Sequence, residues 1–393
     1  MSGDSLAVAL LNLALLATTA KGFAAAPGQI KSTMIEPSPG DASADPGPLA
    51  TDLSGVLKPS AIQAAMRKVA DWQSERITDH PSEDWTYAAL YLGMLSASET
   101  LKDPRYHDLV EKVAEHYQWS LGPRITHADD QAIGQSYLWL YRETPSTDRI
   151  RPIQTQFDTI MKLPDDPSKP VWWWCDALFM APPVWSGLAA ATGDSKYLDY
   201  MDHEWKLTSD LLWDPQERLF FRDKSYFEKR EKNGRKVFWS RGNGWVMGGL
   251  VRVLESLPEN DPRRPSYVER LRAMAKSVAR LQGKDGLWRS GLLDAANYPD
   301  PEVSGSAFFV YATAWGVNHH LLAPDRYGPV VRRGWAGLVS HIYADGRLGC
   351  IQPIAGAPGV YPPGSSYVYG VGAFLLAGSE VNRWAEHSSA IAH

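Results

Sequence analysis

Cysteine is scarce in this chain of 393 residues, which contains only Cys175 and Cys350. Two thiols exclude a framework of several disulfides and the usual zinc sites with four cysteine or histidine ligands. Long runs of Lys or Arg are also missing and the formal net charge is −5, so the chain lacks the electrostatic footprint of a nucleic-acid-binding protein. The apolar run at residues 6–17 is too short to cross a bilayer. We therefore expect neither a nucleic-acid partner nor a membrane span.

Aromatic residues, in contrast, are abundant. The chain has 16 Trp and 17 Tyr within a composition that is 44% hydrophobic and 22% charged, which excludes wholesale disorder. Aromatic side chains suit the flat apolar faces of sugar rings, and they also build large cores. The count alone does not choose between these two uses.

The first 55 residues differ from the rest of the chain. The apolar run at residues 6–17 is followed by small residues, including three alanines at 24–26, which is typical of a secretory signal. Its first four residues lack the usual Lys or Arg, so an N-terminal helix is the alternative. We predict a signal peptide at residues 1–26, with export to the periplasm or beyond. Residues 27–55 are rich in Pro, Gly, Ser and Asp and predict a flexible leader.

From residue 56 to about 388 the pattern is helical. Apolar residues recur at helical spacing, for example in residues 246–254. With clusters of Gly, Pro, Asn and Asp taken as breaks, twelve helices are predicted, at residues 58–78, 84–99, 104–120, 130–143, 147–162, 182–192, 194–212, 243–256, 265–282, 304–319, 325–343 and 368–386. One β-hairpin is expected around Asn233-Gly234, between Phe220 and Phe238.

Twelve helices suggest a toroid of six helical hairpins, with inner and outer rings alternating. Every second helix is preceded by a dense polar and aromatic cluster: residues 84–85, 127–130, 172–176, 239–245, 302–306 and 365–367. In such a toroid these helices run parallel, so their N-termini meet at one mouth and the clusters form one site. Helix capping explains the Ser and Asp residues in the clusters but not the tryptophans.

Four long motifs in this region resemble a known enzyme family. They are WWWCDALFMAPP (172–183), FWSRGNGWV (238–246), EVSGSAFFVYATAWGV (302–317) and YGVGAFLLAGSE (369–380). In this order they resemble glycoside hydrolase family 105, whose members are unsaturated uronyl or rhamnogalacturonyl hydrolases, over about residues 60–385. Family 88, the unsaturated glucuronyl hydrolases, is similar in fold and chemistry. The resemblance implies an all-α (α/α)6 barrel, which agrees with the helix count.

The resemblance also implies an unusual hydrolysis. The substrate is an acidic oligosaccharide whose non-reducing end carries a double bond between C4 and C5, which makes the ring an enol ether. Protonation of C4 leaves an oxocarbenium ion at C5, water adds there, and the resulting hemiketal opens and releases the rest of the chain. One carboxyl group can donate the C4 proton and then accept a proton from water, so the usual pair flanking the anomeric bond is unnecessary.

Asp176 is our candidate for this acid/base. It follows three tryptophans and precedes Pro182, which suits the first position of a helix, and the catalytic Asp of the family falls at this position in the matching motif. Aromatic neighbours should raise its pKa by desolvation. The alternative is an Asp that only caps a helix.

Asp129 is the second candidate carboxylate, because the family places an Asp in the corresponding segment. Asp130 is then expected as the helix N-cap, although the reverse assignment stays open. His127 would complete a metal site with these residues, but no second His or Cys is clustered with it. We therefore expect no metal and no cofactor.

Arg241 is the candidate partner for the substrate carboxylate, since its planar guanidinium matches a carboxylate with two hydrogen bonds. The helix start expected after Asn243 would add N–H groups and a positive dipole end. Trp239 and Trp245 flank this arginine and suit a sugar ring. The other substrate-binding candidates from the clusters are His127, Asp130, Trp174 and Ser304.

Arg222 marks a departure from the family, some members of which have a His where it appears. It suits a second anion contact, for instance with a sulfated neighbouring sugar, or equally a solvated ion pair with Asp223 or Glu217.

Two other functions fit a helical toroid. An inverting glycosidase would need an acid and a base well separated across the site, roles open to Asp129 and Asp176. A non-catalytic toroid that binds sugars would retain its function after Asp176→Asn. Dependence of turnover on the double bond separates the first alternative from the unsaturated uronyl hydrolase.

Overall fold

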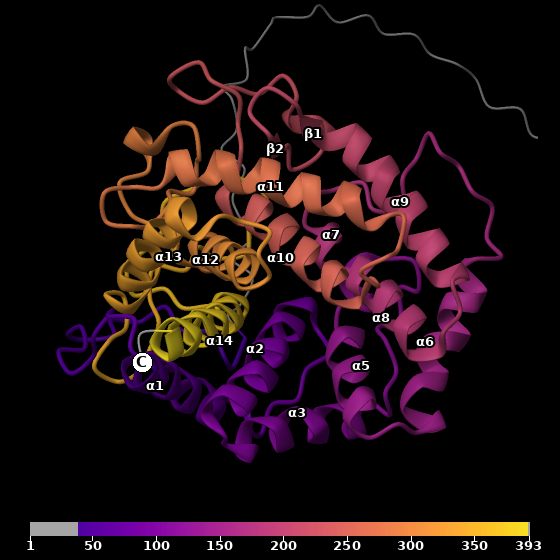
Figure 1. The fold of residues 1–393 in the computed structure, drawn as a ribbon, viewed down its shortest axis with the longest axis horizontal. Helices are drawn as coiled ribbons and strands as arrows, with labels where there is room; N and C mark the ends of the chain where they lie inside the picture. Colours follow the sequence, from indigo (N-terminus) through magenta and orange to yellow (C-terminus); the bar gives the residue numbers. More distant parts are fainter. Residues whose placement is uncertain (1–37, 392–393) are drawn as a thin grey trace, which may run out of the picture. The chain divides into compact units, whose positions relative to one another are not determined.

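The structure is a computed structural model that describes residues 38–391, and this part of the chain is largely helical (Figure 1). Six helices form an outer ring: α1 (Pro59–Ile77), α3 (Pro104–His116), α6 (Thr147–Ile160), α9 (Lys196–Leu212), α11 (Arg264–Leu281) and α13 (Pro324–Val339). Six form an inner ring: α2 (Trp85–Leu101), α5 (Gly134–Glu143), α8 (Pro182–Thr192), α10 (Ser240–Ser256), α12 (Val303–Asn318) and α14 (Val368–Ile391). The twelve predicted helices are confirmed, with bounds that differ by no more than five residues.

Contacts between neighbouring helices close the inner ring. Each inner helix packs on the next, in the order α2, α5, α8, α10, α12 and α14, and α14 packs again on α2. The outer helices cover this ring, as α9 does on α8 and α13 on α12, and in Figure 1 they lie toward its rim. The arrangement is the expected (α/α)6 barrel.

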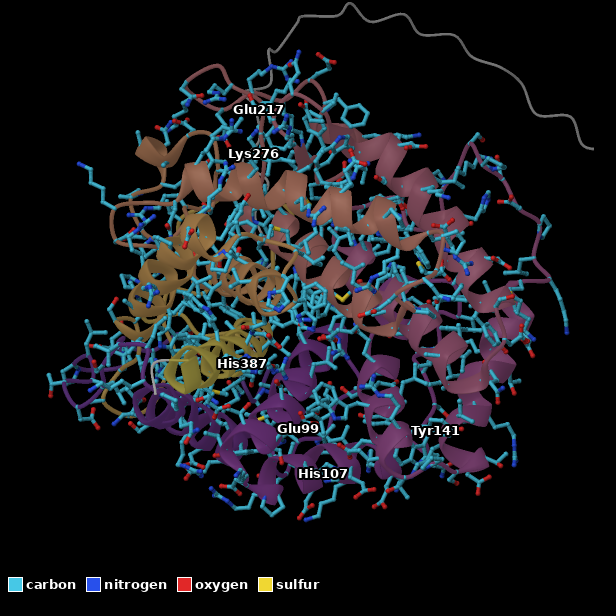
Figure 2. The ribbon with its side chains drawn as sticks, viewed as in Figure 1. Glu99, His107, Tyr141, Glu217, Lys276 and His387 are labelled. Atoms are coloured by element: carbon cyan, nitrogen blue, oxygen red, sulfur yellow. The ribbon has the colours of Figure 1, made fainter. Side chains whose placement is uncertain are left out.

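Burial explains which helices are inside. All residues of α12 from Val303 to Val317 are buried, whereas α3 buries only Tyr106, Val110, Val113 and Ala114. A helix that is apolar all round belongs inside, and one with a single apolar stripe covers it. Side chains occupy the space between the rings (Figure 2).

Two short helices precede inner helices at the expected mouth. α4 (Ala128–Gln131) comes before α5, and α7 (Ala177–Met180) comes before α8. α8 begins at Pro182, as predicted. The start predicted for α10 is wrong, because this helix begins at Ser240 and the Asn243 side chain bonds instead to the backbone N–H and C=O of Phe220, at 2.8 and 3.0 Å.

Strands contribute little to the described residues. β1 (Trp213–Asp214) and β2 (Leu219–Phe220) form an antiparallel pair that the sequence did not predict. The hairpin expected at Asn233-Gly234 is reduced to a single bridge between Arg230 and Lys236, with Gly234 at the turn in a left-handed conformation (φ +82°). Two short 3-10 helices, η1 (Lys224–Tyr226) and η2 (Ala295–Asn297), complete the elements.

The part of the expected leader that the structure describes, residues 38–55, packs on the barrel. Ala42 pairs with Ser366 just before α14, and the buried carboxylate of Asp41 accepts from the backbone N–H of Val368 at 3.0 Å. These bonds hold a segment whose composition alone predicted flexibility. The expected signal, residues 1–26, lies outside the described residues. None of the described helices is long and apolar enough to span a membrane.

Glycine lets α2 and α14 approach closely. A Cβ atom on Gly372 would lie 2.2 Å from the carbonyl oxygen of Ala89, and one on Gly93 would lie 2.6 Å from that of Gly372. Backbone atoms at such distances cannot move aside as the end of a flexible side chain can. The contact that closes the ring therefore requires glycine.

We predict that Gly372→Ala lowers the free energy of unfolding by about 1–3 kcal/mol, the usual cost of overpacking, despite the better helix propensity of Ala. Gly187→Ala in α8 is the matched control, since its Cβ would meet only the side-chain end of Leu138, at 3.1 Å. The control should keep or slightly raise stability. Urea unfolding measures both, and equal midpoints for the two variants would refute a backbone clash between α2 and α14.

Candidate active site

The N-terminal ends of the inner helices meet at one mouth. The ring of Trp85, at the start of α2, lies 6.1 Å from that of Trp245 in α10 and 5.6 Å from that of Tyr369 in α14. The guanidinium of Arg241, also in α10, lies 4.8 Å from the Tyr369 ring. Clusters far apart in sequence thus form one site, as the toroid predicted.

Asp176 lies at this mouth, just before α7, with 13% of its side chain exposed. Its Oδ2 atom accepts a hydrogen bond from the Cys175 thiol at 3.4 Å and lies 3.8 Å from Nε of Arg222. Burial raises the pKa of Asp176 above its usual value, while the positive charge of Arg222 and the thiol oppose the rise. The carboxyl group therefore has the desolvated setting that a general acid near neutrality requires.

Asp129 is the second carboxyl group of the site. Burial, and then the negative charge of Asp176, raise the pKa of Asp129 to about 7, against the opposing charge of Arg124. It lies in α4, and 21% of its side chain is exposed. Two carboxyl groups that share a desolvated site do not both ionise readily, so these two interact in their titration.

Asp130 has a different environment. Both of its carboxylate oxygens bind Arg124, through the backbone N–H at 2.7 Å, through Nε at 2.9 Å and through Nη2. The N-cap of α4 is His127, whose Nδ1 accepts from the Asp129 N–H, so the N-cap role expected for Asp130 is wrong. Because the Asp130 carboxylate is hydrogen bonded to Arg124, Asp129 is the carboxyl group of this pair that is available at the mouth.

His127 and Trp174 pack together beside these carboxyl groups, with ring centroids 4.9 Å apart. Trp174 is nearly buried, and its neighbour Trp173 is half exposed, 4.9 Å away. The three tryptophans before Asp176 therefore differ in exposure, because Trp172 and Trp174 are buried and Trp173 is half exposed.

Arg241 is built into the wall of the site. It is fully buried, and its Nη1 and Nη2 atoms donate to the carbonyl oxygens of Gln352 and Pro353 at 2.6 and 2.8 Å. Its guanidinium lies 4.6 Å from the ring of Trp239, which is 2% exposed. The fork that we expected to bind the substrate carboxylate already binds the backbone.

Two other candidates from the sequence are internal. Trp245 is completely buried among Trp85, Phe179 and Phe308, so its ring has no face for a sugar. Ser304 is also buried, and its hydroxyl donates to Oε1 of Glu302 at 2.5 Å within the N-cap of α12. Neither side chain is exposed at the mouth in this structure, and the substrate contacts expected of them stay predictions.

Arg222 forms one of the two ion pairs that the sequence left open, and the anion contact stays a prediction. Its Nη1 pairs with Asp223 at 2.7 Å, whereas Glu217 pairs with Arg235. Yet it is no solvated surface group, because only 25% of its side chain is exposed and it lies beside Asp176 and over the Trp173 ring, 5.6 Å away.

Several residues of the site were not predicted. Arg124 and Gln352 lie outside the clusters before the inner helices, and nothing in their local sequence marks them. Tyr369 stands in the fourth motif, and its hydroxyl donates to the Gln352 carbonyl at 2.6 Å. A cavity of about 330 Å³ opens beside Asp129, and Trp85, which is half buried, lines it.

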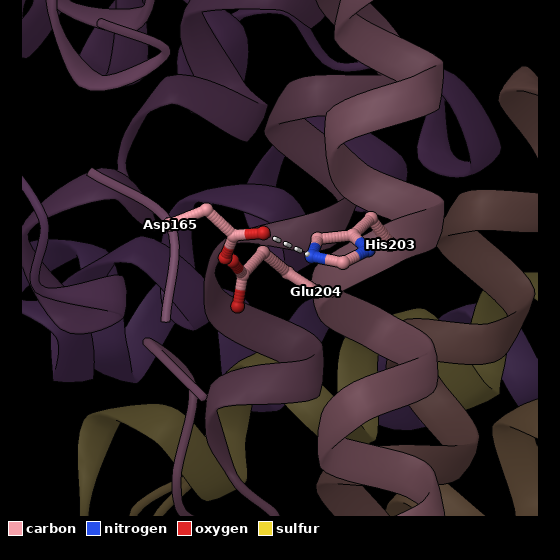
Figure 3. Close-up of side chains that lie close together, drawn as sticks. All are labelled: Asp165, His203 and Glu204. Atoms are coloured by element: carbon pink, nitrogen blue, oxygen red, sulfur yellow. Dashed lines mark hydrogen bonds and ion pairs between the residues drawn. The ribbon is translucent and has the colours of Figure 1, made fainter. Parts of the chain in front are cut away.

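Within residues 38–391, one group of side chains has the make-up of a metal site. Asp165, His203 and Glu204 place one ligand atom each within 4.8 Å of one another, on α9 and the loop before Trp172 (Figure 3). His203 Nε2 lies 3.1 Å from Asp165 Oδ2, and Glu204 accepts from the Val171 N–H at 3.1 Å. The group does not include His127, Asp129 or Asp130, the residues weighed as ligands from the sequence.

Comparison with known proteins gives a consistent result. Residues 60–385 match the family model of Glycosyl Hydrolase Family 88. The chain is 38% identical to an unsaturated 3S-rhamnoglycuronyl hydrolase from Formosa agariphila, over 83% of this chain and 91% of the relative. A protein of the same name from Alteromonas sp. is 33% identical, over 85% and 90%. A solved glycosyl hydrolase family 88 structure from Bacteroides vulgatus has a TM-score of 0.80 at 29% identity, covering 83% of this chain and 99% of that one.

The raised pKa of Asp129 predicts how stability depends on pH. Because about 7 exceeds the unfolded value near 3.9, the folded protein binds more protons between them, and its free energy of unfolding falls as pH rises through this window. Asp129→Asn removes this titration. Relative to the wild type, the free energy of unfolding of this variant should therefore increase between about pH 4 and pH 7, by roughly 4 kcal/mol at most. The difference should stay constant above about pH 7.

Urea unfolding near pH 5 and near pH 8 measures the effect. Asp130→Asn is the control, since it weakens the pairing with Arg124 and should lower stability at both pH values. If the difference in free energy of unfolding between Asp129→Asn and the wild type is the same at both pH values, this carboxyl group titrates normally.

Proposed function

This chain belongs to glycosyl hydrolase family 88, and from that membership we propose which substrate it takes and which residues perform the reaction. It is a glycoside hydrolase that removes a terminal 4,5-unsaturated uronic acid from an oligosaccharide. The resemblance found in the four motifs, to the related families 105 and 88, is thereby confirmed.

The substrate that we propose is an unsaturated rhamnoglycuronyl oligosaccharide. Support comes from the two relatives above 30% identity, which are both named 3S-rhamnoglycuronyl hydrolases. A relative named for unsaturated rhamnogalacturonyl hydrolysis, from Bacillus subtilis, is 22% identical. The departure at Arg222 fits a substrate that differs from rhamnogalacturonan.

Asp176 acts as the general acid in this proposal, and its desolvated position beside the mouth is the observation that carries it. Its proton is transferred to C4, and the C4=C5 electron pair forms the new C–H bond, which leaves an oxocarbenium ion at C5. Water adds to C5 and gives up a proton to the Asp176 carboxylate. The hemiketal then opens to a keto-sugar and releases the remaining oligosaccharide.

Asp129 completes the pair of carboxyl groups. Its pKa of about 7 lets it hold or release a proton near neutrality, which suits a group that hydrogen-bonds the sugar or the attacking water. Trp85 is the aromatic residue that we propose for contact with the sugar ring. It lines the cavity beside Asp129, whereas Trp245, whose ring lies 6.1 Å from that of Trp85, is completely buried.

Asp176→Asn tests the acid. The amide has no proton to give at C4, so kcat should fall by about 10²–10⁴-fold, while the fold and substrate binding persist. Loss of the ultraviolet absorbance of the double bond measures the rate. Asp223→Asn, which changes a carboxylate next to Arg222 rather than the acid, should reduce kcat much less.

Wild-type turnover in heavy water tests the mechanism itself. Deuterium should appear at C4 of the released keto-sugar, because that carbon takes its new hydrogen from the Asp176 carboxyl group, whose proton exchanges with the solvent. A product that remains unsaturated and unlabelled would mean direct cleavage of the glycosidic bond, and the inverting glycosidase would then replace this proposal.

A panel of lyase-generated oligosaccharides tests the substrate. Unsaturated rhamnoglycuronyl products should be turned over with a higher kcat/KM than those from pectin or glycosaminoglycans. Preference for a galacturonyl product would overturn the substrate class and leave the reaction type intact.

A further inference from the structure

The arginines at the mouth differ in how many of their hydrogen-bond donors are free. Arg241 is fully buried and uses Nη1 and Nη2 on backbone carbonyls, so that only its Nε lacks a hydrogen-bond partner among the described residues. Arg124 uses Nε and Nη2 on the carboxylate of Asp130. Neither offers a free fork to an anionic ligand.

In Arg222, by contrast, the two donors on one edge, Nε and Nη2, are both free of hydrogen bonds among the described residues. Only its Nη1 is hydrogen bonded, to Asp223, and its buried Nε has no hydrogen-bond partner among the described residues. Nε lies 3.8 Å from Oδ2 of Asp176, too far for a hydrogen bond. Gly356 faces the same edge of the guanidinium, where a Cβ would lie 3.4 Å from Nε. A buried N–H without a partner is costly unless a ligand satisfies it.

We propose that Arg222, and not Arg241, binds the carboxylate of the unsaturated sugar, and that it exchanges its ionic contact with Asp176 for this one when substrate binds. The inference rests on the proposed function. In the substrate the carboxylate carbon is attached to C5, next to the C4 atom that receives the proton from Asp176. An anion at Arg222 is thus beside the reacting carbons, whereas a sulfate on the leaving sugar lies across the glycosidic bond.

This exchange has a consequence for the acid. The charged and titratable groups that face Asp176 are Arg222, Arg241, Cys175, Asp129 and Tyr226. Of the two cations, Arg241 is fully buried, so only Arg222 can have its charge neutralised by a ligand. Once it is, the pKa of Asp176 rises further, and bound substrate itself keeps the acid protonated.

Kinetics of Arg222→Gln on an unsaturated rhamnoglycuronyl disaccharide test the contact. KM should rise on the order of 10–100-fold, the usual loss for a hydrogen bond to a charged group. Arg222→Lys keeps the positive charge but not the planar pair of donors, so its KM should lie between those of the wild type and Arg222→Gln. Arg235→Gln is the control, since it removes the same charge from an exposed arginine paired with Glu217 and should leave KM unchanged.

The methyl ester of the same disaccharide isolates the carboxylate. Replacing acid by ester should raise KM in the wild type and in Arg235→Gln, but much less in Arg222→Gln. An ester effect as large in Arg222→Gln as in the wild type would overturn the assignment. So would an Arg222→Gln effect confined to sulfated substrates, which would place a sulfate at this arginine instead.

The pH profiles test the exchange of charge. Because the acid must be protonated, activity falls above its pKa, and kcat/KM reports the free enzyme whereas kcat reports the complex. The alkaline limb of kcat should lie at higher pH than that of kcat/KM in the wild type, and the two limbs should converge in Arg222→Gln. Coincident limbs in the wild type would refute the exchange. Absence of wild-type activity on every unsaturated uronide would instead refute the proposed function.

Discussion

The burial of two carboxyl groups at one end of the inner ring is the constraint on which the rest of this structure depends. Parallel inner helices bring Asp129 and Asp176 to the same mouth, and desolvation there raises the pKa of both. A buried charge is tolerated only with nearby compensation, and Arg222 and Arg124 supply it on either side. The chemistry of the site follows from this balance, because a carboxyl group that ionises reluctantly is the one that can donate a proton near neutrality.

Arg241 shows the opposite solution to the same problem. Its Nη1 and Nη2 groups donate to the carbonyls of Gln352 and Pro353, and the guanidinium lies over the faces of Trp239 and Tyr369, while its buried Nε has no hydrogen-bond partner among the described residues. Those bonds fix the loop after Cys350 against α10 and α14. The cation thereby shapes the wall and contributes a positive charge near Asp176, while the ligand contacts that we propose come from side chains nearer the solvent.

The sequence predicted the barrel because its signals are local. Apolar spacing and Gly or Pro breaks place the helices, and Pro182 marks the start of α8 because proline suits a first helical position. Errors arose where a side chain serves a distant partner. Asn243 reads as a local cap, but its amide binds Phe220. Trp245 stands in one of the clusters, yet nothing local shows that its ring packs against Trp85, Phe179 and Phe308, and the sugar contact expected of it stays a prediction. Arg124 and Gln352 could not be predicted from the sequence, since they belong to the site only through their contacts with Asp130 and Arg241.

The contact between α2 and α14 joins the first and last helices of the inner ring. Every other neighbouring pair in that ring is consecutive among the inner helices, but this pair is separated by nearly the whole chain. Residues 38–42 lie across the same junction, where Gly40 meets Val368, Gln73 and the hydroxyl of Tyr87. During synthesis the ring must therefore remain open until the final helix has left the ribosome. The ring of Trp85, which lines the cavity beside Asp129, can stack on that of Tyr369 only after α14 has been synthesised.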